Sequence, residues 1–190
     1  MIDLRCQHTK PKDGGSKVWV PKPSTHWVVE PKYNGWRVAL HPNGHIISRH
    51  GNLLGTTQEP TYAFLDPFRA PNYIIDGELM GHRSKEHSLA FFAFDLMPLC
   101  SDLDFTFEIR RKVLCGLFDT HTTLNPIKPG EVWVAAQYPV DGVYNLYELL
   151  SFQPFLLGIE NYLIYEGVVI KDLNRKYKHN DWIKFRFDQH

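Results

Sequence analysis

The chain has 190 residues, of which 43% are hydrophobic and 14% are aromatic, and its 21 basic side chains are balanced by 21 acidic ones. This length suits one well-buried domain and falls short of what two full domains usually need. A protein that coats nucleic acid through its overall charge is usually basic, so the zero net charge excludes that class and leaves a local patch for any nucleic-acid contact.

Neither a membrane span nor a secretory signal is predicted. The apolar runs stay well below the roughly eighteen residues of a spanning helix, and residues 1–6 lack a basic start and an apolar centre. The three cysteines, Cys6, Cys100 and Cys115, are an odd number without metal-ligand spacing. We therefore expect a reduced intracellular setting, cytoplasmic or nucleoid-associated, with no membrane partner.

Residues 1–25 are polar and rich in proline and glycine, which predicts an irregular arm rather than a domain. In residues 26–190, apolar and polar positions alternate in several stretches, as is typical of strands. The turn sequence His41-Pro42-Asn43-Gly44 predicts a hairpin. The predicted strand regions are Trp27–Leu40, His45–Arg49, Asn72–Met80, Leu89–Met97, Val132–Tyr138, Tyr162–Lys171 and Trp182–Phe187.

Two helices are predicted between these strands. The first has Thr106 as its N-cap and Glu108 in its first turn; its apolar residues at helical spacing are Ile109, Val113, Leu114, Leu117 and Phe118. The second opens with a capping box of Asn145 and Glu148 and ends before Pro154. Strands of mostly antiparallel appearance combined with helices predict an α+β fold.

The most informative stretch is Lys32-Tyr33-Asn34-Gly35-Trp36-Arg37, which we expect to place an amine and a guanidinium on one face of a short extended segment. Lysine is a useful nucleophile only when its surroundings lower the proton affinity of the amine. Alone, such a pair is usually two solvated charges. Five further blocks follow it in order: Ser48-Arg49-His50-Gly51, Asp76-Gly77-Glu78-Leu79, Phe94-Asp95-Leu96, Glu166-Gly167-Val168-Val169-Ile170-Lys171 and Trp182-Ile183-Lys184-Phe185-Arg186.

Taken together, these blocks resemble the motif series of the covalent nucleotidyltransferases, the superfamily of ATP-dependent DNA ligases, RNA ligases and mRNA capping enzymes. The nearest likeness is to ATP-dependent DNA ligases, whose first motif reads Lys-Tyr-Asp-Gly-x-Arg after a Glu-x-Lys that is matched here by Glu30-Pro31-Lys32. The resemblance covers roughly residues 26–188. It implies a nucleotidyltransferase (adenylation) domain over residues 26–190, built from two antiparallel sheets flanked by helices with a nucleotide cleft between them.

The resemblance also implies roles in the chemistry of ATP. Lys32 corresponds to the nucleophile that forms a covalent lysyl-AMP, and we expect the neighbouring Lys171 and Lys184 and a divalent ion to lower the pKa of its amine. Glu166 is the first candidate ligand for Mg²⁺ or Mn²⁺, and Glu78 is the second. The basic residues expected to grip phosphate oxygens are Lys171, Lys184 and Arg186, the last standing where many DNA ligases have a second lysine.

Four residues correspond to family positions around the nucleoside and the reacting phosphate. Glu30 is expected beside the adenine, where its carboxylate can accept a hydrogen bond from the exocyclic amine. Phe94 is expected to stack on the purine, although its alternative role is a simple core residue. Arg37 and Glu78 are expected near the ribose and the reacting phosphate. Arg49 is expected at the ribose or at the 5′-phosphate of the strand being sealed.

Basic residues also gather near the C-terminus, where they indicate either a solvated surface or a phosphate-facing strip. We favour the strip because motifs lie at both its ends. Its members are Lys171, Arg175, Lys176, Lys178, Lys184 and Arg186.

These observations predict a monomeric, minimal ATP-dependent polynucleotide ligase that joins a 5′-phosphate to a 3′-hydroxyl. Nicked duplex DNA is the preferred substrate, in replication or repair, and RNA or an RNA–DNA hybrid is the alternative. A capping guanylyltransferase fits less well, because it carries Lys-x-Asp-Gly in a longer chain. A non-catalytic nucleic-acid-binding module with the same fold is the alternative from a different class.

Two departures from the family pattern bear on activity. Asn34 replaces the aspartate of the first motif, which removes a charge close to the nucleophile and puts the rate of adenylation in question. The chain ends at His190, directly after the last block, so we expect no OB-fold domain of the kind that typical DNA ligases carry. We therefore expect a separate OB-fold or clamp-like partner. An alternative is that this chain is one half of a split enzyme whose OB-fold domain is a separate chain.

Overall fold

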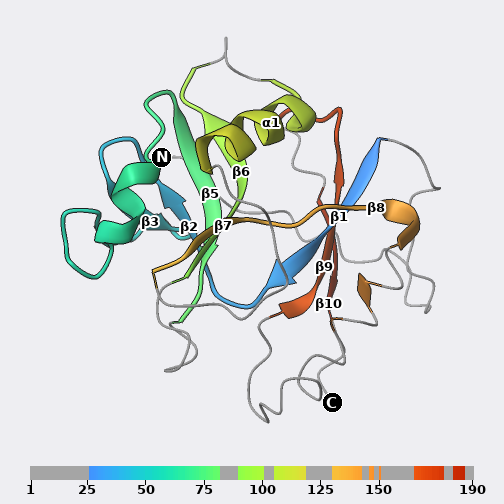
Figure 1. Ribbon diagram of the computed structural model, residues 1–190, viewed down its shortest axis with the longest axis horizontal. Coiled ribbons are helices and arrows are strands. Elements are labelled where there is room, and N and C mark those ends of the chain that lie inside the picture. Colours follow the sequence, from blue (N-terminus) through green and yellow to red (C-terminus); the bar gives the residue numbers. More distant parts are fainter. Residues whose placement is uncertain are drawn as a thin grey trace.

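The computed structural model describes residues 26–81, 90–100, 105–118, 130–142, 146–147, 150, 165–177 and 182–186. The strands in these ranges form two sheets, and the helix α1 (Phe107–Phe118) lies beside them (Figure 1). The architecture is α+β and mostly sheet, which confirms the predicted fold class. No helix among the described residues is long and apolar enough to cross a membrane.

The smaller sheet has four strands in the order β10-β9-β1-β8, and every neighbouring pair is antiparallel. Its strands are β1 (Trp27–Tyr33), β8 (Tyr138–Pro139), β9 (Tyr165–Asp172) and β10 (Ile183–Arg186). The central pair, β1 and β9, is joined along the whole length of β1. This sheet therefore brings the first motif of the chain beside the last two.

One face of the four-stranded sheet is polar, because directly opposed residues of antiparallel strands share a face. Glu30 and Lys184 lie on either side of Val169. In the same way, Lys32 and Arg186 lie on either side of Gly167. The charged residues on this face are Glu30, Lys32, Lys171, Lys184 and Arg186. The other face is apolar and contributes to a buried core through Val29, Tyr33, Val168 and Ile170.

The larger sheet has six strands in the order β4-β3-β2-β5-β6-β7. They are β2 (Trp36–Leu40), β3 (His45–Ser48), β4 (Leu53–Thr56), β5 (Tyr73–Leu79), β6 (Phe91–Pro98) and β7 (Val132–Val134). The expectation of two wholly antiparallel sheets is wrong for β6 and β7, which are parallel. The reason is that α1 lies between them in the chain, and a helical crossover is the usual connection between parallel strands.

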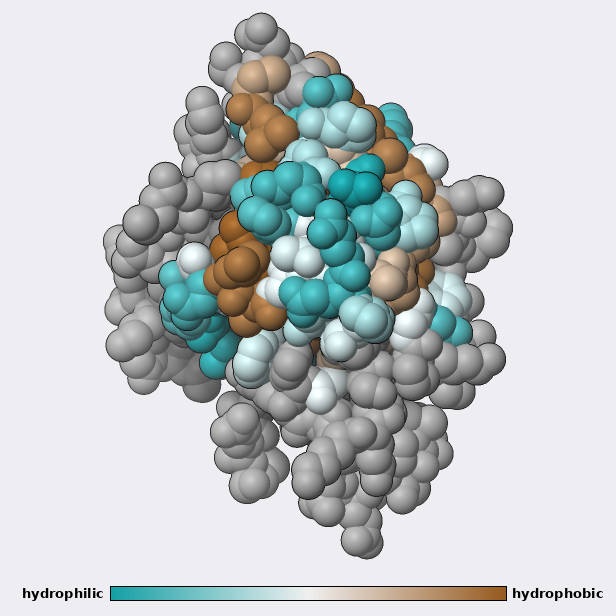
Figure 2. Space-filling view, turned by 90° about the vertical axis from the view of Figure 1, so that its left-hand side faces the viewer, coloured by the Kyte–Doolittle hydropathy of each residue, from teal (hydrophilic) through white to brown (hydrophobic). Residues whose placement is uncertain are grey.

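One face of the six-stranded sheet packs against α1 and the 3-10 helix η1 (Ala63–Phe68). The buried residues there include Val38, Leu40, Leu65, Ile75, Leu79, Leu96, Leu114 and Phe118. By register, the opposite face carries four charged residues, Arg37, Asp76, Glu78 and Asp95. Figure 2 looks at the molecule from the side of β3, β4 and η1, where polar residues cover the middle of the surface and hydrophobic residues flank them.

Helix α1 begins where the sequence predicted, but its buried face is different. Ile109 and Leu117 are 42% and 39% exposed, whereas Arg110 is only 2% exposed. The guanidinium of Arg110 donates through Nε to Oδ1 of Asp95 at 2.8 Å and through Nη2 to Oδ2 at 3.0 Å. This paired charge takes a position toward the protein interior and turns part of the predicted apolar stripe outward. The helix buries Phe107, Arg110, Leu114 and Phe118.

The first turn of α1 is joined to the connection between β9 and β10. The backbone N–H of Phe107 donates to the carbonyl of Arg175 at 2.7 Å, and that of Glu108 donates to the carbonyl of Leu173 at 2.9 Å. Arg110 adds a hydrogen bond from Nη1 to the Arg175 carbonyl at 3.2 Å. The helix that covers the larger sheet therefore also fixes a segment of the smaller one.

Several predicted strands are confirmed, and two regions divide between the sheets. The predicted hairpin turn over residues 41–44 is confirmed: it joins the antiparallel strands β2 and β3, and Gly44 has a φ of +85°. Residues 27–40 form β1 and β2 in different sheets, so Lys32 and Arg37 do not share a face of one segment. The predicted strand over residues 132–138 is wrong as a single element, since β7 and β8 also lie in different sheets. The N-terminal arm and the capping-box residues Asn145 and Glu148 lie outside the described residues.

The buried Asp95–Arg110 pair leads to a prediction about stability. Replacement Arg110→Ala leaves the Asp95 carboxylate buried without its partner, and we expect the free energy of unfolding to fall by about 3–5 kcal/mol. The matched control is Lys112→Ala, which removes an exposed ion pair with Glu108 on the same helix and should change stability little. Urea unfolding followed by circular dichroism measures both. Equal losses in the two variants would contradict a structural role for the buried pair.

Candidate active site

Lys32 lies on β1 and forms an ion pair with Oε1 of Glu166 on β9. Both side chains are only partly exposed, at 13% and 20%. The register explains the contact: Lys32 opposes Gly167, but Tyr33 opposes Tyr165, so Glu166 is an extra residue on β9 at this point. Such a bulge redirects side chains locally.

Gly167 makes this bulge possible. Its φ is +146°, which side-chain-bearing residues rarely adopt. A Cβ at this position would also collide with the backbone carbonyl of Phe185 on β10. The Glu-Gly pair at the start of β9 is therefore a geometric requirement for placing the carboxylate of Glu166 beside Lys32.

Glu30 and Lys171 form a buried ion pair on the same polar face. The Nζ of Lys171 lies 2.6 Å from Oε2 of Glu30, and both side chains are 2% exposed. Gln137 donates from Nε2 to Oε1 of Glu30 at 2.8 Å, and Lys171 donates to the carbonyl of Phe94 at 3.0 Å. Burial lowers the pKa of Lys171, an effect that the negative charge of Glu30 opposes. The lysine therefore spans from the smaller sheet to β6 of the larger one.

Arg37 on β2 is held by Asp76 on β5. Its Nε donates to Oδ1 of Asp76 at 2.9 Å, and its Nη2 pairs with Oδ2 of the same fully buried carboxylate. The guanidinium also lies over two rings, 4.9 Å from the centroid of Trp182 and 5.6 Å from that of Phe94. This arrangement leaves the side chain of Arg37 10% exposed and restricts its orientation.

Glu78, also on β5, has an unusual proton affinity. Burial raises its pKa to about 7, although the positive charge of Lys32 and a hydrogen bond from the backbone N–H of Gly35 at 3.0 Å oppose that shift. At neutral pH this carboxyl group therefore carries a proton about half of the time. Perturbed groups of this kind are concentrated at functional sites.

Comparison with known families identifies the chain. The sequence model of the RNA ligase family matches residues 25–186. The chain belongs to the RNA ligase family. The motif-based assignment to a ligase nucleotidyltransferase domain is thereby confirmed. No curated protein matches the chain.

Solved structures share this fold at low sequence identity. A Lig E DNA ligase, described as binding DNA with a minimal scaffold, is 20% identical with a TM-score of 0.57, over 87% of this chain and 64% of its own. Mycobacterial DNA ligase D, solved with ATP and MES, is 21% identical with a TM-score of 0.57, over 86% and 55%. An archaeal ATP-dependent RNA ligase is 21% identical with a TM-score of 0.53, over 86% and 43%. The chain thus spans less than two thirds of the length of each.

The structure brings together most of the residues that the motifs of this family single out. Lys32, Glu166 and Arg186 are neighbours, with Arg186 Nη2 3.8 Å from Oε1 of Glu166. Lys184 shares their face of the sheet and is partly buried. Arg49 lies beside Arg37, at the end of the neighbouring strand: its backbone N–H donates to the carbonyl of Arg37 at 3.2 Å, and its side chain is exposed and contacts His50. The roles of these residues toward a nucleotide remain predictions.

Two expectations about Lys171 differ from the structure. It was expected beside Lys32 and on a phosphate-facing strip, but it pairs with Glu30 and is buried. The register is the cause, because Lys171 opposes Val28, four residues before Lys32. Lys171 is therefore not a surface residue, the phosphate-facing role of the other strip residues stays a prediction, and Lys178 lies outside the described residues.

Some residues that shape the site have weak sequence signals. Asp95 was quoted within a motif, but only the structure pairs it with Arg110. Gln137 and Tyr177 stand in no motif, and their partners are 107 and 101 residues away in the chain. Such contacts depend on how the two sheets meet and leave no local pattern.

The carboxyl groups of Glu166 and Glu78 provide oxygen ligands of the type that Mg²⁺ prefers. Both interact with Lys32, the first as an ion pair and the second through its charge. No group of three or more histidine, cysteine or acidic side chains close enough to hold a metal occurs in the part of the chain that the structure describes. Two carboxylates nevertheless fit a magnesium ion, because this ion commonly takes its other ligands from substrate phosphates and water.

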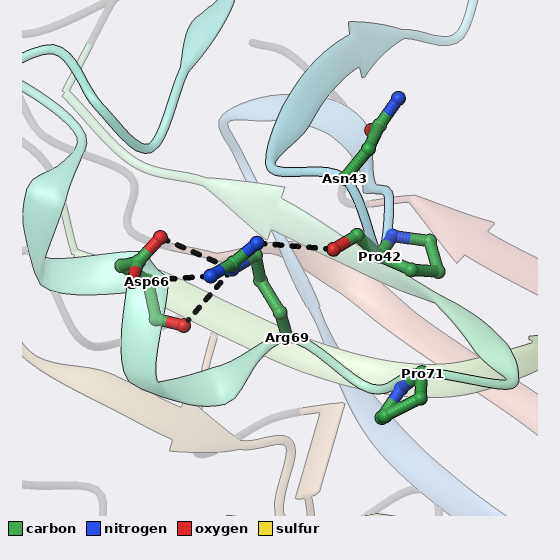
Figure 3. A pocket seen from close by; sticks show the side chains of 5 residues that line it. All are labelled: Pro42, Asn43, Asp66, Arg69 and Pro71. Carbon is green, nitrogen blue, oxygen red and sulfur yellow. Dashed lines mark hydrogen bonds and ion pairs between the residues drawn. The ribbon is translucent and has the colours of Figure 1, made fainter.

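A surface pocket lies elsewhere, at the turn after β2 and the end of η1 (Figure 3). Its only basic side chain is Arg69, which donates to the carbonyl of Pro42 at 3.2 Å and pairs with Asp66 at 3.0 Å. None of the predicted site residues lines it. Because these neighbours already engage the guanidinium, the pocket does not resemble an anion site.

The raised pKa of Glu78 predicts a pH-dependent stability. Between about pH 4.5, its ordinary pKa, and pH 7, the folded chain retains a proton that the unfolded chain has released, so this residue destabilises the fold as pH rises. Glu78→Gln should remove this loss and gain at most about 3 kcal/mol relative to wild type between pH 4.5 and pH 8.

Urea unfolding at both pH values measures the difference. Glu108→Gln serves as the control, because Lys112 lowers the pKa of that surface carboxyl and the small effect of the substitution should have the opposite sign. A Glu78→Gln variant that keeps the wild-type pH profile would show that Glu78 titrates normally.

Proposed function

We propose that this protein is an ATP-dependent polynucleotide ligase that seals nicks between a 5′-phosphate and a 3′-hydroxyl through a lysyl-AMP intermediate. The observation that carries the proposal is the placement of Lys32 beside the carboxyl groups of Glu166 and Glu78. A lysine with two adjacent carboxyl groups has a proton acceptor within reach. An ordinary surface lysine has no such surroundings.

The first step forms one bond and breaks another. The unprotonated Nζ of Lys32 attacks the α-phosphorus of ATP, the new N–P bond forms, and the bond from this phosphorus to the bridging oxygen breaks and releases pyrophosphate. The ammonium proton must leave before or during attack. The contacting carboxylate of Glu166 is the proposed acceptor, since a general base must be within hydrogen-bond reach.

The surrounding residues supply binding and charge compensation in this proposal. Lys184 and Arg186 lie on the face that carries Lys32 and would neutralise phosphate oxygens. Glu30, Phe94 and Arg37 would hold the nucleoside. A divalent cation at Glu166 and Glu78 would further offset the negative charge of the triphosphate. The later steps transfer AMP to the 5′-phosphate of the nick, after which the 3′-hydroxyl displaces AMP and forms the phosphodiester bond.

The proposed substrate is nicked duplex DNA. Support comes from the Lys-Tyr-x-Gly-x-Arg and Phe-Asp-Leu motifs and from the shared fold of DNA ligases that are described as binding DNA or were solved with ATP. The family name and the archaeal relative make RNA the competing substrate. Sealing assays on matched strands separate the two.

The first test of this function is covalent labelling with α-labelled ATP and magnesium, followed by a denaturing gel. Wild type should retain an acid-labile label, and Lys32→Ala should lose it because the nucleophile is gone. Lys112→Ala is the matched control, since this lysine is exposed on α1 and should leave labelling unchanged. Labelling of Lys32→Ala at the wild-type level would assign the nucleophile to another residue.

A second test identifies the nucleic acid. We expect labelled protein to seal a nicked DNA duplex faster than the same nick in RNA or in an RNA–DNA hybrid. Faster sealing of RNA would overturn the DNA assignment but retain the ligase. Nucleic-acid binding without labelling, and without sealing of a pre-adenylated nick, would instead support the non-catalytic binding module.

A further inference from the structure

Tyr177 lies on the connection between β9 and β10, outside the motifs that carry the proposed chemistry. Its side-chain hydroxyl donates to Oδ2 of Asp76 at 2.9 Å, and the residue is 8% exposed. The ring packs in a small core cluster with Ala39, Ile74 and Met97. The tyrosine therefore connects the smaller sheet to the polar face of the larger one.

Asp76 is shared between Tyr177 and Arg37. One carboxylate oxygen, Oδ1, accepts from Nε of Arg37, while Oδ2 accepts from both Nη2 of Arg37 and the tyrosine hydroxyl. The carboxylate is fully buried. Its orientation therefore depends on these donors, and any change at Tyr177 reaches Arg37 through a single side chain.

The hydroxyl of Tyr177 is suited to remain a donor. Burial, followed by the negative charge of Asp76, raises its pKa well above the ordinary value, so the group keeps its proton across the physiological range. Arg110 fixes the backbone nearby through the carbonyl of Arg175, and its guanidinium lies 5.5 Å from the centre of the Tyr177 ring. Tyr177 is thus held by the hydrogen bond of its hydroxyl to Asp76 and by the contact of its ring with Arg110.

We propose that Tyr177 is a positioning residue that orients the guanidinium of Arg37 through Asp76. It lies between β9 and β10 in the chain, so it also ties the connection that leads to Lys184 to the arginine on the opposite sheet. The inference deepens the proposed function and rests on it, because Arg37 is there assigned to the nucleotide.

The variant Tyr177→Phe removes the hydroxyl and keeps the ring. We expect single-turnover formation of lysyl-AMP to slow by about tenfold, the effect of losing one charge-assisted hydrogen bond at a group that acts in the reaction. The ATP concentration for half-maximal rate should rise as well, because Arg37 is assigned to the nucleoside and loses part of its positioning. The matched control is Tyr62→Phe, another buried tyrosine, whose ring belongs to the core beneath η1 and which should react at the wild-type rate.

A double-mutant cycle separates positioning from a merely structural role. In an Arg37→Lys background the planar guanidinium is absent, so adding Tyr177→Phe should slow lysyl-AMP formation no further. Independent, additive losses would show that Tyr177 does not act through Arg37 and would overturn the inference. A wild-type rate in the single variant Tyr177→Phe would overturn it as well.

The failure of the proposed function would be visible separately. If wild type forms no adduct with ATP, the ligase proposal fails, and the same four proteins are compared by urea unfolding. Non-additive changes in the free energy of unfolding would then still support positioning of Arg37 by Tyr177, whereas additive changes would exclude it.

Discussion

The passage of the chain from one sheet to the other between β1 and β2 determines how the site is assembled. β1 ends at Tyr33 and β2 begins at Trp36, so only Asn34 and Gly35 separate a strand of the smaller sheet from a strand of the larger one. A Cβ on Gly35 would lie 2.6 Å from the carbonyl oxygen of Leu79, and the N–H of Gly35 donates to Glu78. This short crossing places Lys32 and Arg37 on separate sheets and brings β5, with its two acidic residues, next to both.

Three buried or nearly buried ion pairs then hold neighbouring strands and the helix together, and Lys171 of the first pair also reaches the other sheet. Glu30–Lys171 reaches β6, Arg37–Asp76 joins β2 to β5, and Asp95–Arg110 joins β6 to α1. Pairs of this kind add little net stability compared with apolar residues, because removing two charges from water offsets their attraction. Their effect is on geometry: each charge must find its partner, which selects one arrangement of the sheets. The strands β1 and β9, far apart in sequence, pair along the whole length of β1, and the Glu30–Lys171 ion pair lies between them.

The sequence predicts the elements better than the contacts between them. Alternation and an Asn-Gly turn were enough to indicate extended structure over residues 27–40, β3 and the hairpin that joins β2 to β3, since these depend on local patterns, but not to divide residues 27–40 between two sheets. Periodicity failed for α1, because a hydrophobicity pattern cannot foresee that Arg110 is buried against Asp95 while Ile109 faces solvent. It also could not divide residues 132–138 between two sheets.

For the candidate site, too, the sequence predicts the residues better than the contacts between them. Motif order indicated Lys32, Glu78 and Glu166, and the structure brings them together. The pairing of Lys171 with Glu30 could not be read from the motifs, because it depends on the register of β9 against β1. The pKa of Glu78 likewise follows from burial among charges contributed by both sheets. These properties arise only once the sheets have met.

The two carboxyl groups beside Lys32 differ in what they can do for a nucleophilic amine. Glu166 contacts the ammonium directly, and this attraction favours the protonated lysine, which is the unreactive form. Glu78 has a pKa of about 7 and exists at neutral pH as a mixture of charged and uncharged forms, so its attraction for the ammonium varies with pH. As pH falls, protonation of Glu78 removes one negative charge near Lys32, while Glu166 is the carboxyl group in direct contact with the amine. The two carboxyl groups therefore act on the amine of Lys32 in different ways, Glu166 through direct contact and Glu78 through a charge that changes with pH.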